Sequence, residues 1–218
     1  MRFLLMDTCG SEGSIALADI GQPVPILASE TLPGRTASER LVPAVRRVIE
    51  RCGWRLRDLN AIVIVHGPGS FTGVRVGLSA AKGLSEAAGV PLIAVSRLAL
   101  LAARGGDGLV HAALDAGRGE FYLGRYRAGE CLEEALLTAE EVLASSADTT
   151  VVVCEPKVAE ALATLKPQLV PEPNAADTLP VAARRAAEGS FDEAALLDAN
   201  YLRRTDSQIF AKPKSTVR

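Results

Sequence analysis

Apolar residues occur in two patterns along the chain, as short unbroken runs and as longer stripes with helical spacing. The runs at residues 2–6, 61–65 and 92–95 are almost wholly apolar, which is typical of strands buried on both faces of a sheet. The stripes over residues 36–52 and 72–88 return to one face of a helix with each turn, which predicts amphipathic helices. This alternation predicts an α/β fold.

The order of predicted elements occurs twice. The first half predicts strands at 2–6, 14–19, 25–31, 61–65 and 92–95, and helices at 36–52, 72–88 and 96–104. The second half predicts strands at 109–114, 121–127, 132–137 and 150–154, and helices after Thr138 and at 157–165, 180–188 and 193–203. Each half begins strand, strand, strand, helix, strand, helix, which indicates two related α/β lobes.

The clearest break in the pattern is the Gly-Gly-Asp-Gly segment at residues 105–108. Glycine clusters of this kind mark loops between elements. We therefore expect lobes over residues 1–104 and 105–204. The polar tail, 205–218, is expected to be disordered.

Two helices carry a start signal in the sequence. Thr36 with Glu39, and Thr138 with Glu141, have the spacing of a capping box, in which the two side chains satisfy backbone N–H groups at the helix start. Pro43 lies inside the first of these helices and is expected to bend it.

Composition narrows the class of protein. Hydrophobic residues make up 48% of the 218 residues and charged residues 23%, which excludes a wholly disordered chain. The 35 alanines far outnumber the nine aromatic residues, so the core must be built from small side chains. No apolar run reaches the ~18 residues that cross a bilayer, and the first run is too short for a signal peptide. We therefore expect a cytoplasmic protein without a membrane segment.

Charge and metal-ligating residues give little indication of chemistry. The net charge of −2 gives the chain no overall positive potential that would attract nucleic acid. The charge is unevenly distributed, with a net charge of +3 over residues 1–103 and −5 over residues 104–218. The four cysteines are widely spaced, and we expect them to be buried thiols in a reducing compartment. His66 and His111 lie 45 residues apart, which argues against a zinc site.

The most informative stretch is His66-Gly-Pro-Gly-Ser-Phe-Thr-Gly, followed by the helix at 72–88. A glycine-rich turn before a helix can present N–H groups to a phosphate. The P-loop pattern fails because Lys82 lies too far along the helix. The dinucleotide fingerprint fails because Thr72 stands at its third glycine and no acidic residue follows at the expected distance.

The helix at 72–88 contains three glycines, each costing up to about 1 kcal/mol relative to alanine. Gly73, Gly77 and Ala80 lie on one face, with Val76 and Gly83 beside it. Two interpretations remain open: close packing on the chain's own sheet, or a flat surface on which another helix docks.

The stretch GPGSFTGVRVGLSAAKGL resembles the bacterial TsaB family of tRNA threonylcarbamoyladenosine biosynthesis subunits. Further segments similar to that family at matching order and spacing are MRFLLMDT, SERLVPAV, Leu114-Asp115-Ala116, Glu120-Phe121-Tyr122 and Tyr201-Leu202-Arg203. The resemblance implies a reduced actin-like ATPase fold in which each lobe is a mixed sheet flanked by helices. The chain departs from the family pattern at Ala37, Gly117 and His66, so no role is carried over to those side chains.

The resemblance also implies a function. Family members are non-catalytic partners of a TsaD-type subunit, which transfers a threonylcarbamoyl group to the adenosine beside the tRNA anticodon. ATP or ADP and a metal are then expected on that catalytic subunit rather than here, a TsaE-type ATPase subunit joins the complex, and tRNA contact is mainly indirect. The partner surface is expected on the helices at 36–52 and 72–88, which could pair with a second copy when the chain is alone. Its expected residues are Glu39, Pro43, Arg46, Gly73, Val76, Gly77, Ala80 and Gly83.

Two enzymatic alternatives remain. Actin-like kinases bind phosphate at the turn after the first strand of each lobe, where this chain has Asp7, Thr8 and Gly10 in one half and Asp115 in the other. Those aspartates would equally serve to end a strand and cap a turn, and lobes this short leave little room for an adenosine pocket. A peptidase would need a catalytic triad, which could be assembled only from Ser70, His66 and Asp115. The glycines around Ser70 do not match the Gly-x-Ser-x-Gly nucleophile elbow.

Overall fold

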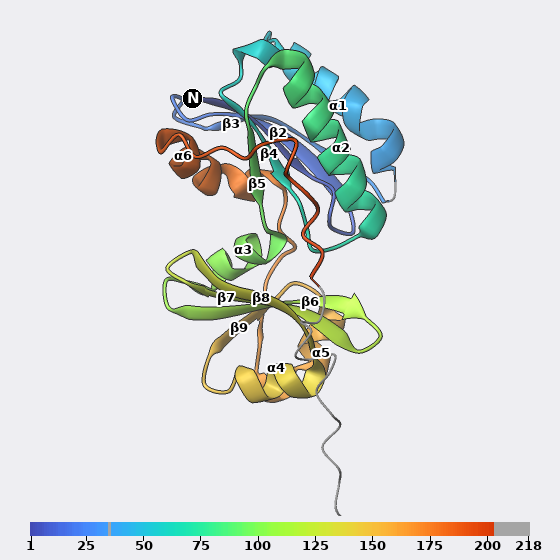
Figure 1. Ribbon diagram of the computed structural model, residues 1–218, viewed down its shortest axis with the longest axis vertical. Coiled ribbons are helices and arrows are strands. Elements are labelled where there is room, and N and C mark those ends of the chain that lie inside the picture. Colours follow the sequence, from blue (N-terminus) through green and yellow to red (C-terminus); the bar gives the residue numbers. More distant parts are fainter. Residues whose placement is uncertain (35, 203–218) are drawn as a thin grey trace, which may run out of the picture.

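Two five-stranded mixed sheets with the same strand order form the framework of the computed structural model, which describes residues 1–34 and 36–202. The first sheet has the order β3-β2-β1-β4-β5 and the second β8-β7-β6-β9-β10. In each sheet the first two strands are antiparallel, whereas the later strands run parallel to the first. The α/β fold of two related lobes is therefore confirmed (Figure 1).

The strands of the first lobe are β1 (Arg2–Asp7), β2 (Gly13–Asp19), β3 (Ile26–Leu32), β4 (Ala61–Val65) and β5 (Leu92–Val95). Those of the second are β6 (Leu109–Gly117), β7 (Glu120–Arg127), β8 (Glu130–Thr138), β9 (Thr150–Val153) and β10 (Gln168–Leu169). The α-helices are α1 (Ala37–Arg51), α2 (Phe71–Ala88), α3 (Arg97–Ala102), α4 (Ala139–Ser145), α5 (Pro156–Ala161) and α6 (Leu179–Ala187). Short 3-10 helices include η2 (Ala103–Gly105) and η4 (Ala175–Thr178).

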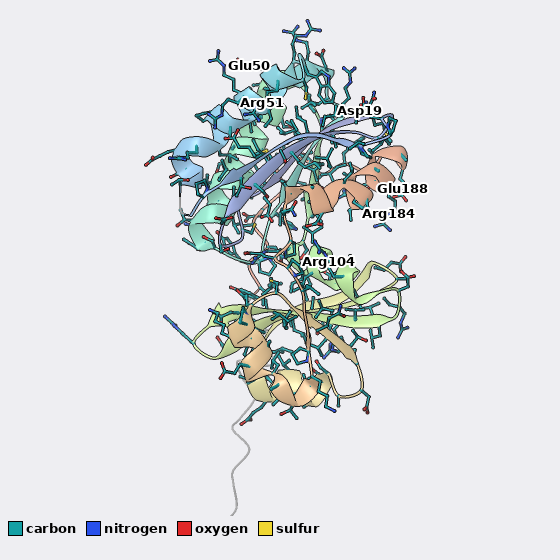
Figure 2. All side chains as sticks on the ribbon, turned by 180° about the vertical axis from the view of Figure 1, so that it is seen from behind. Asp19, Glu50, Arg51, Arg104, Arg184 and Glu188 are labelled. Atoms are coloured by element: carbon teal, nitrogen blue, oxygen red, sulfur yellow. The ribbon has the colours of Figure 1, made fainter. Side chains whose placement is uncertain are left out.

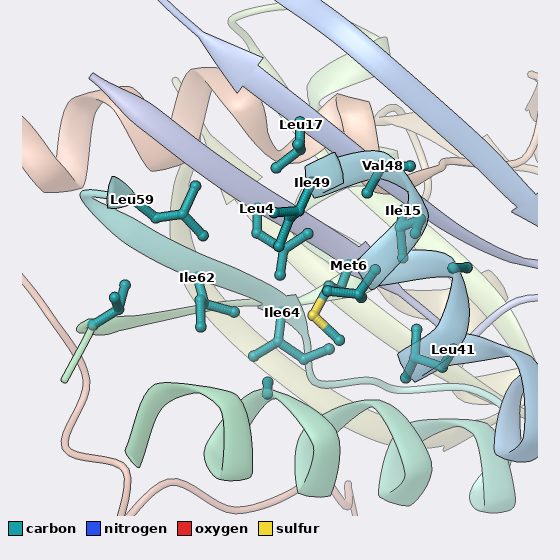
Figure 3. Packing of buried hydrophobic residues seen from close by; sticks show 14 of the residues in the cluster. Leu4, Met6, Ile15, Leu17, Leu41, Val48, Ile49, Leu59, Ile62 and Ile64 are labelled. Atoms are coloured by element: carbon teal, nitrogen blue, oxygen red, sulfur yellow. The ribbon is translucent and has the colours of Figure 1, made fainter. Parts of the chain in front are cut away.

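Helices cover both faces of the first sheet, with α1 and α2 on one face and α6 on the other (Figure 1). Successive residues of a strand point to opposite faces, so Leu4 and Met6 pack beneath α1 and α2 while Phe3 and Leu5 face the other side. Figure 3 shows Leu4 and Met6 close to Ile64 and to the side chains of α1. Because both faces are covered, the central strands read as unbroken apolar runs.

The chain returns to the first lobe after completing the second sheet. Ala175 in η4 and Ala182 in α6 are fully buried against Phe3, Leu5 and Val63. Arg104, at the waist between the lobes in Figure 2, forms an ion pair of 2.8 Å with Asp177. The second lobe expected over 105–204 is therefore wrong in its C-terminal part, because small alanine side chains let η4 and α6 pack closely on the first sheet. The tail at 205–218 lies outside the described residues.

Two further local expectations differ from the structure. Thr36 does not cap α1: its hydroxyl donates to the carbonyl of Pro33 at 2.7 Å, away from the helix N–H groups. The segment 193–202 contains no helix, and it instead runs across the first lobe, where Asn200 N–H donates to the carbonyl of His66. The capping box of Thr138 and Glu141 is confirmed.

The cysteines are less uniform than expected. Cys9 is buried, Cys52 and Cys154 are half-buried, and Cys131 is exposed. Among residues 1–34 and 36–202, no helix has both the length and the apolar character needed to cross a membrane.

Candidate functional site

A cleft of about 940 Å³ opens between the two lobes. Its walls come from the turns after β1 and β6, the N-terminus of α2, Arg97 of α3, and the segments after β9 and β10. A volume of this size is within the range of small-molecule sites, so the expectation that these lobes leave little room is not supported by the geometry.

Asp7 ends β1 and is turned away from the cleft. Its carboxylate accepts the backbone N–H of Cys9 at 2.8 Å, and the residue is only 2% exposed. Burial raises the pKa of Asp7, and the nearby Arg97 only partly offsets that rise. Asp7 thus acts as the cap of the turn after β1, and its buried carboxylate is poorly placed to hold a magnesium ion in the cleft.

Asp115 occupies the equivalent place in the second lobe and does line the cleft. Its carboxylate accepts the N–H of Gly117 at 3.1 Å and pairs with the Lys157 ammonium at 2.5 Å. The hydrogen bond from Lys157 lowers the pKa of Asp115. Its own N–H donates to Glu155 at 2.7 Å. Two backbone N–H groups of this turn, those of Asp115 and Gly117, are therefore already bonded to side chains of the chain itself.

Thr8 explains two of the glycines in α2. Its hydroxyl donates to the carbonyl of Gly73 at 2.6 Å. A Cβ on Gly73 would lie 1.9 Å from the Thr8 carbonyl oxygen, and one on Gly77 would lie 2.2 Å from Thr8 Oγ1. Gly73 and Gly77 are therefore required for packing inside the chain. Their expected place on a partner surface is wrong, because the turn after β1 covers them.

The turn after β1 also holds a carboxylate from the segment that follows β10. Glu172 accepts the N–H of Ser11 at 2.9 Å and the hydroxyl of Ser11 at 2.6 Å, and it forms an ion pair with Arg97. A Cβ on Gly10 would lie 2.3 Å from Glu172 Oε1. The sequence offered no signal for Glu172, because its 161-residue separation from Ser11 is closed only by the returning chain.

The other expected partner residues lie on α1 and α2 and keep part of their surface open to solvent. Glu39, Pro43 and Arg46 are exposed on α1. On α2, Val76 and Ala80 are half-buried and Gly83 is exposed. A Cβ on Gly83 would have no neighbouring atom within 4 Å, so contacts within the described part of the chain do not explain this glycine.

Two exposed apolar side chains extend this outer surface. Val42 is 55% exposed on α1. Phe71 is 57% exposed at the start of α2, where the Arg75 guanidinium lies 3.6 Å from the centre of its ring. We define the outer helix surface as Glu39, Val42, Pro43, Arg46, Phe71, Val76, Ala80 and Gly83.

The residues of the conceivable peptidase triad have other partners. Ser70 caps α2 by accepting the N–H of Gly73 at 3.2 Å, and His66 Nδ1 lies 3.1 Å from the carbonyl oxygen of Asp198. Asp115 is paired with Lys157. Over the described ranges, no group of three His, Cys, Asp or Glu side chains is arranged to hold a metal ion.

Two lobes with one strand order, facing each other across a cleft bounded by the turns after β1 and β6, define a two-lobed protein of the actin-like ATPase type. The family model of TsaD, tRNA N6-adenosine threonylcarbamoyltransferase, matches residues 25–175. A structure described as YeaZ from Pseudomonas aeruginosa superposes with a TM-score of 0.77 at 33% identity, covering 92% of this chain and 99% of that one. The chain belongs to the TsaB (YeaZ) family.

Curated relatives agree with this assignment. The chain is 36% identical over 145 residues to the tRNA threonylcarbamoyladenosine biosynthesis protein TsaB of Bacillus subtilis, covering 66% of this chain and 62% of that protein. It is 38% identical over 134 residues to the TsaB of Escherichia coli, covering 60% of this chain and 57% of that protein. The matched parts thus span less than two thirds of either relative.

Proposed function

We propose that the chain is a non-catalytic subunit in the biosynthesis of threonylcarbamoyladenosine in tRNA, and that it binds and activates a TsaD-type catalytic subunit. The observation that carries this proposal is the outer helix surface, which contains a glycine with no use inside the described chain. Gly83 costs about 1 kcal/mol relative to alanine in a helix, and a close approach by another backbone would account for it. The family names are consistent with this role.

The chemistry of the cleft favours an accessory role over catalysis. Asp7 caps its own turn, while Asp115, Glu155 and Lys157 satisfy one another. A general acid or base must reach a substrate with a free proton or lone pair, and these groups are committed to structural contacts. ATP or ADP and the metal of the reaction would then belong to the TsaD-type subunit.

The partner surface suits a helix-to-helix contact. The TsaD family model matches most of this chain, so the two subunits share elements equivalent to α1 and α2. Packing such helices against one another buries the side chains of Val76 and Ala80, and the absence of a side chain at Gly83 lets the two backbones approach closely. The same surface would form a two-fold homodimer when the partner is missing. A TsaE-type ATPase would join this assembly, tRNA contact would be mainly indirect, and the assembly would act in the cytoplasm.

Co-purification with the TsaD-type subunit of the same organism tests the proposal. Gly83→Arg places a long charged side chain on the outer helix surface, so we expect capture of the catalytic subunit to fall at least tenfold. Gly108→Arg is the matched control, because Gly108 also has open space around it but lies in the loop between the lobes. Circular dichroism would check that both variants are folded. Equal capture by wild type and Gly83→Arg would contradict the proposed surface.

The competing candidate is an ATPase in its own right, which the volume of the cleft favours. Calorimetric titration of the isolated chain with Mg-ATP distinguishes the two. The accessory role predicts no saturable binding below millimolar nucleotide, whereas micromolar binding would favour the enzyme.

A further inference from the structure

Three arginines lie on one flank of α1. Arg40, Arg47 and Arg51 follow one another at intervals of seven and four residues, a spacing that brings them to the same side of a helix. All three are exposed. They span about 16 Å of the helix axis at ~1.5 Å per residue, and Arg51 lies far from the second lobe (Figure 2). We define these three residues as the arginine stripe.

A carboxylate of the neighbouring strand, Glu30 of β3, faces the arginine stripe. Both of its oxygens accept from the Arg47 guanidinium, one of them from Nε at 3.2 Å. The hydrogen bond from Arg47 lowers the pKa of Glu30, and the charges of Arg51 and Arg40 lower it further. All three guanidinium groups are therefore close enough to act on a single carboxylate, which shows that they gather on one surface.

The positive charge of the arginine stripe is only partly neutralised. Within the described part of the chain, Arg40 and Arg51 form no ion pair. Glu39 and Glu50 directly precede them in the sequence, but adjacent residues of a helix do not face each other. The stripe and Glu30 thus carry three positive charges against one negative, a local net charge of +2, in a chain whose overall net charge is −2.

The chemistry of the stripe fits a phosphate backbone better than a protein surface. Guanidinium groups bind phosphate through two parallel hydrogen bonds, and basic residues aligned along a helix are a typical electrostatic footprint for nucleic acid. Nucleic-acid backbones carry a charge every few ångströms, so a stripe of this length can contact several phosphates. A protein interface needs an apolar centre, and the exposed apolar residues of α1, Val42 and Pro43, belong to the outer helix surface.

The stripe and α2 lie on opposite sides of α1. Strand β3, which carries Glu30, is the edge strand of the first sheet, whereas α2 packs against β4 on the other side of β1. A subunit bound across α1 and α2 therefore leaves the stripe open. We propose that the arginine stripe binds the phosphate backbone of tRNA, as a limited direct contact that does not read the base sequence. The choice of tRNA as the nucleic acid rests on the proposed function.

Changing the charge of the stripe tests the proposal. The full-length chain would be titrated into fluorescently labelled tRNA, with anisotropy as the readout, from about 50 to 200 mM KCl, where phosphate contacts show their salt dependence. The double variant Arg40→Gln with Arg51→Gln keeps the pair of Arg47 with Glu30 and should bind at least about fivefold more weakly at the lowest salt. Its slope of log affinity against log salt should also fall by about 1–2.

Two further variants serve as controls. Glu30→Gln removes the carboxylate that faces the stripe and should tighten tRNA binding by about twofold or more, a gain that misfolding cannot produce. The double variant Arg127→Gln with Arg184→Gln removes two exposed arginines from β7 and α6 and should stay within about twofold of wild type. Circular dichroism would check the fold of each variant.

Several results would overturn the proposal: no binding of tRNA by wild type below about 100 µM at the lowest salt, unchanged binding by the stripe variant, or an equal loss in the arginine control. Capture of the TsaD-type subunit is measured separately and should be the same for wild type and the stripe variant. Loss of capture with unchanged tRNA binding would show that the stripe is a protein interface instead. Absence of capture by wild type would contradict only the proposed function, because the tRNA titration uses the chain alone.

Discussion

Asp7 and Asp115 occupy the same place in the two lobes, and each accepts the backbone N–H of the residue two positions later, at 2.8 Å and 3.1 Å. Their surroundings are nevertheless opposite. Asp7 is buried and forms no salt bridge with another residue of the ranges 1–34 and 36–202, and burial raises its pKa, whereas Lys157 lowers the pKa of Asp115. The same aspartate-capped turn therefore forms after β1, where the aspartate is buried, and after β6, where it pairs with a lysine.

The two aspartates should affect stability with opposite pH dependence. The unfolded carboxyl of each titrates near 3.8. Between that value and its raised folded pKa, Asp7 binds more protons in the folded state, so its contribution to stability falls as pH rises through this window. The free energy of unfolding of Asp7→Asn, relative to that of wild type, should therefore rise as pH increases from about 4 toward neutrality. Urea unfolding at each pH measures it.

Asp115→Asn provides the contrasting measurement. Because the folded pKa of Asp115 is lowered, the stability gained from its ionised form is present above pH 3.8 and lost as pH falls through the folded pKa. Wild type should therefore have a larger free energy of unfolding than Asp115→Asn near neutral pH, and this difference should disappear in acid. The effect should be small, about 1 kcal/mol or less, because the Lys157 side chain is largely solvent-exposed. The same sign of pH dependence in both variants would contradict the assigned environments.

The glycines of α2 should separate into two groups on substitution by alanine. Gly73→Ala should lower the free energy of unfolding by about 2–3 kcal/mol or more, because the Thr8 backbone must shift to make room. Gly83→Ala should raise it by about 0.5–1 kcal/mol, because alanine is the better helix former and meets no atom there. Chemical denaturation measures both, and a large loss at Gly83 would show that an internal contact explains it.

Glu134 connects elements from both lobes and should stabilise the contact between them. It accepts from Ser96 at the start of α3, from the Tyr126 hydroxyl and from Asn200. Glu134→Ala should cost about 2–4 kcal/mol, because part-buried donors lose their acceptor. It should also increase proteolysis within residues 192–202.

Glu133→Ala serves as the control for Glu134. Glu133 is the adjacent acidic residue of β8, and its pair with Arg125 is exposed, so its loss should cost less than about 1 kcal/mol. Thermal unfolding and limited chymotrypsin digestion of the two variants would be compared side by side, because the segment 192–202 contains leucines and Tyr201 but no lysine or arginine. Equal effects would show that Glu134 has no special role between the lobes.

The central core should be sensitive to loss of volume. Leu4 is fully buried in the layer between β1 and the helices above it (Figure 3), so Leu4→Ala should destabilise the chain by about 2–5 kcal/mol. Leu196→Ala changes a side chain that is 77% exposed and should fall within about 0.5 kcal/mol of wild type. Urea denaturation of the matched pair measures the difference.

The sequence by itself determined every strand except the two-residue β10, together with the main helices and the repeated order of elements. Strand β4 is recognisable because five consecutive apolar residues suit a strand covered on both faces. Helix α2 is recognisable because Val74, Leu78 and Ala81 recur with helical spacing. These signals are local, so they survive without knowledge of distant neighbours. The predicted capping box at Thr36 was wrong because its hydroxyl donates instead to the carbonyl of Pro33, an acceptor that the capping pattern does not take into account.

Only the tertiary structure decided what the glycines face and what fills the cleft. Helical spacing placed Gly73, Gly77 and Gly83 near one another, but only the position of Thr8 showed that the first two serve the chain's own packing. Glu172 and Ser11 are 161 residues apart, and no local pattern links them. Their contact follows from the return of the chain to the first lobe, which small alanines in η4 and α6 make close enough to deliver the carboxylate.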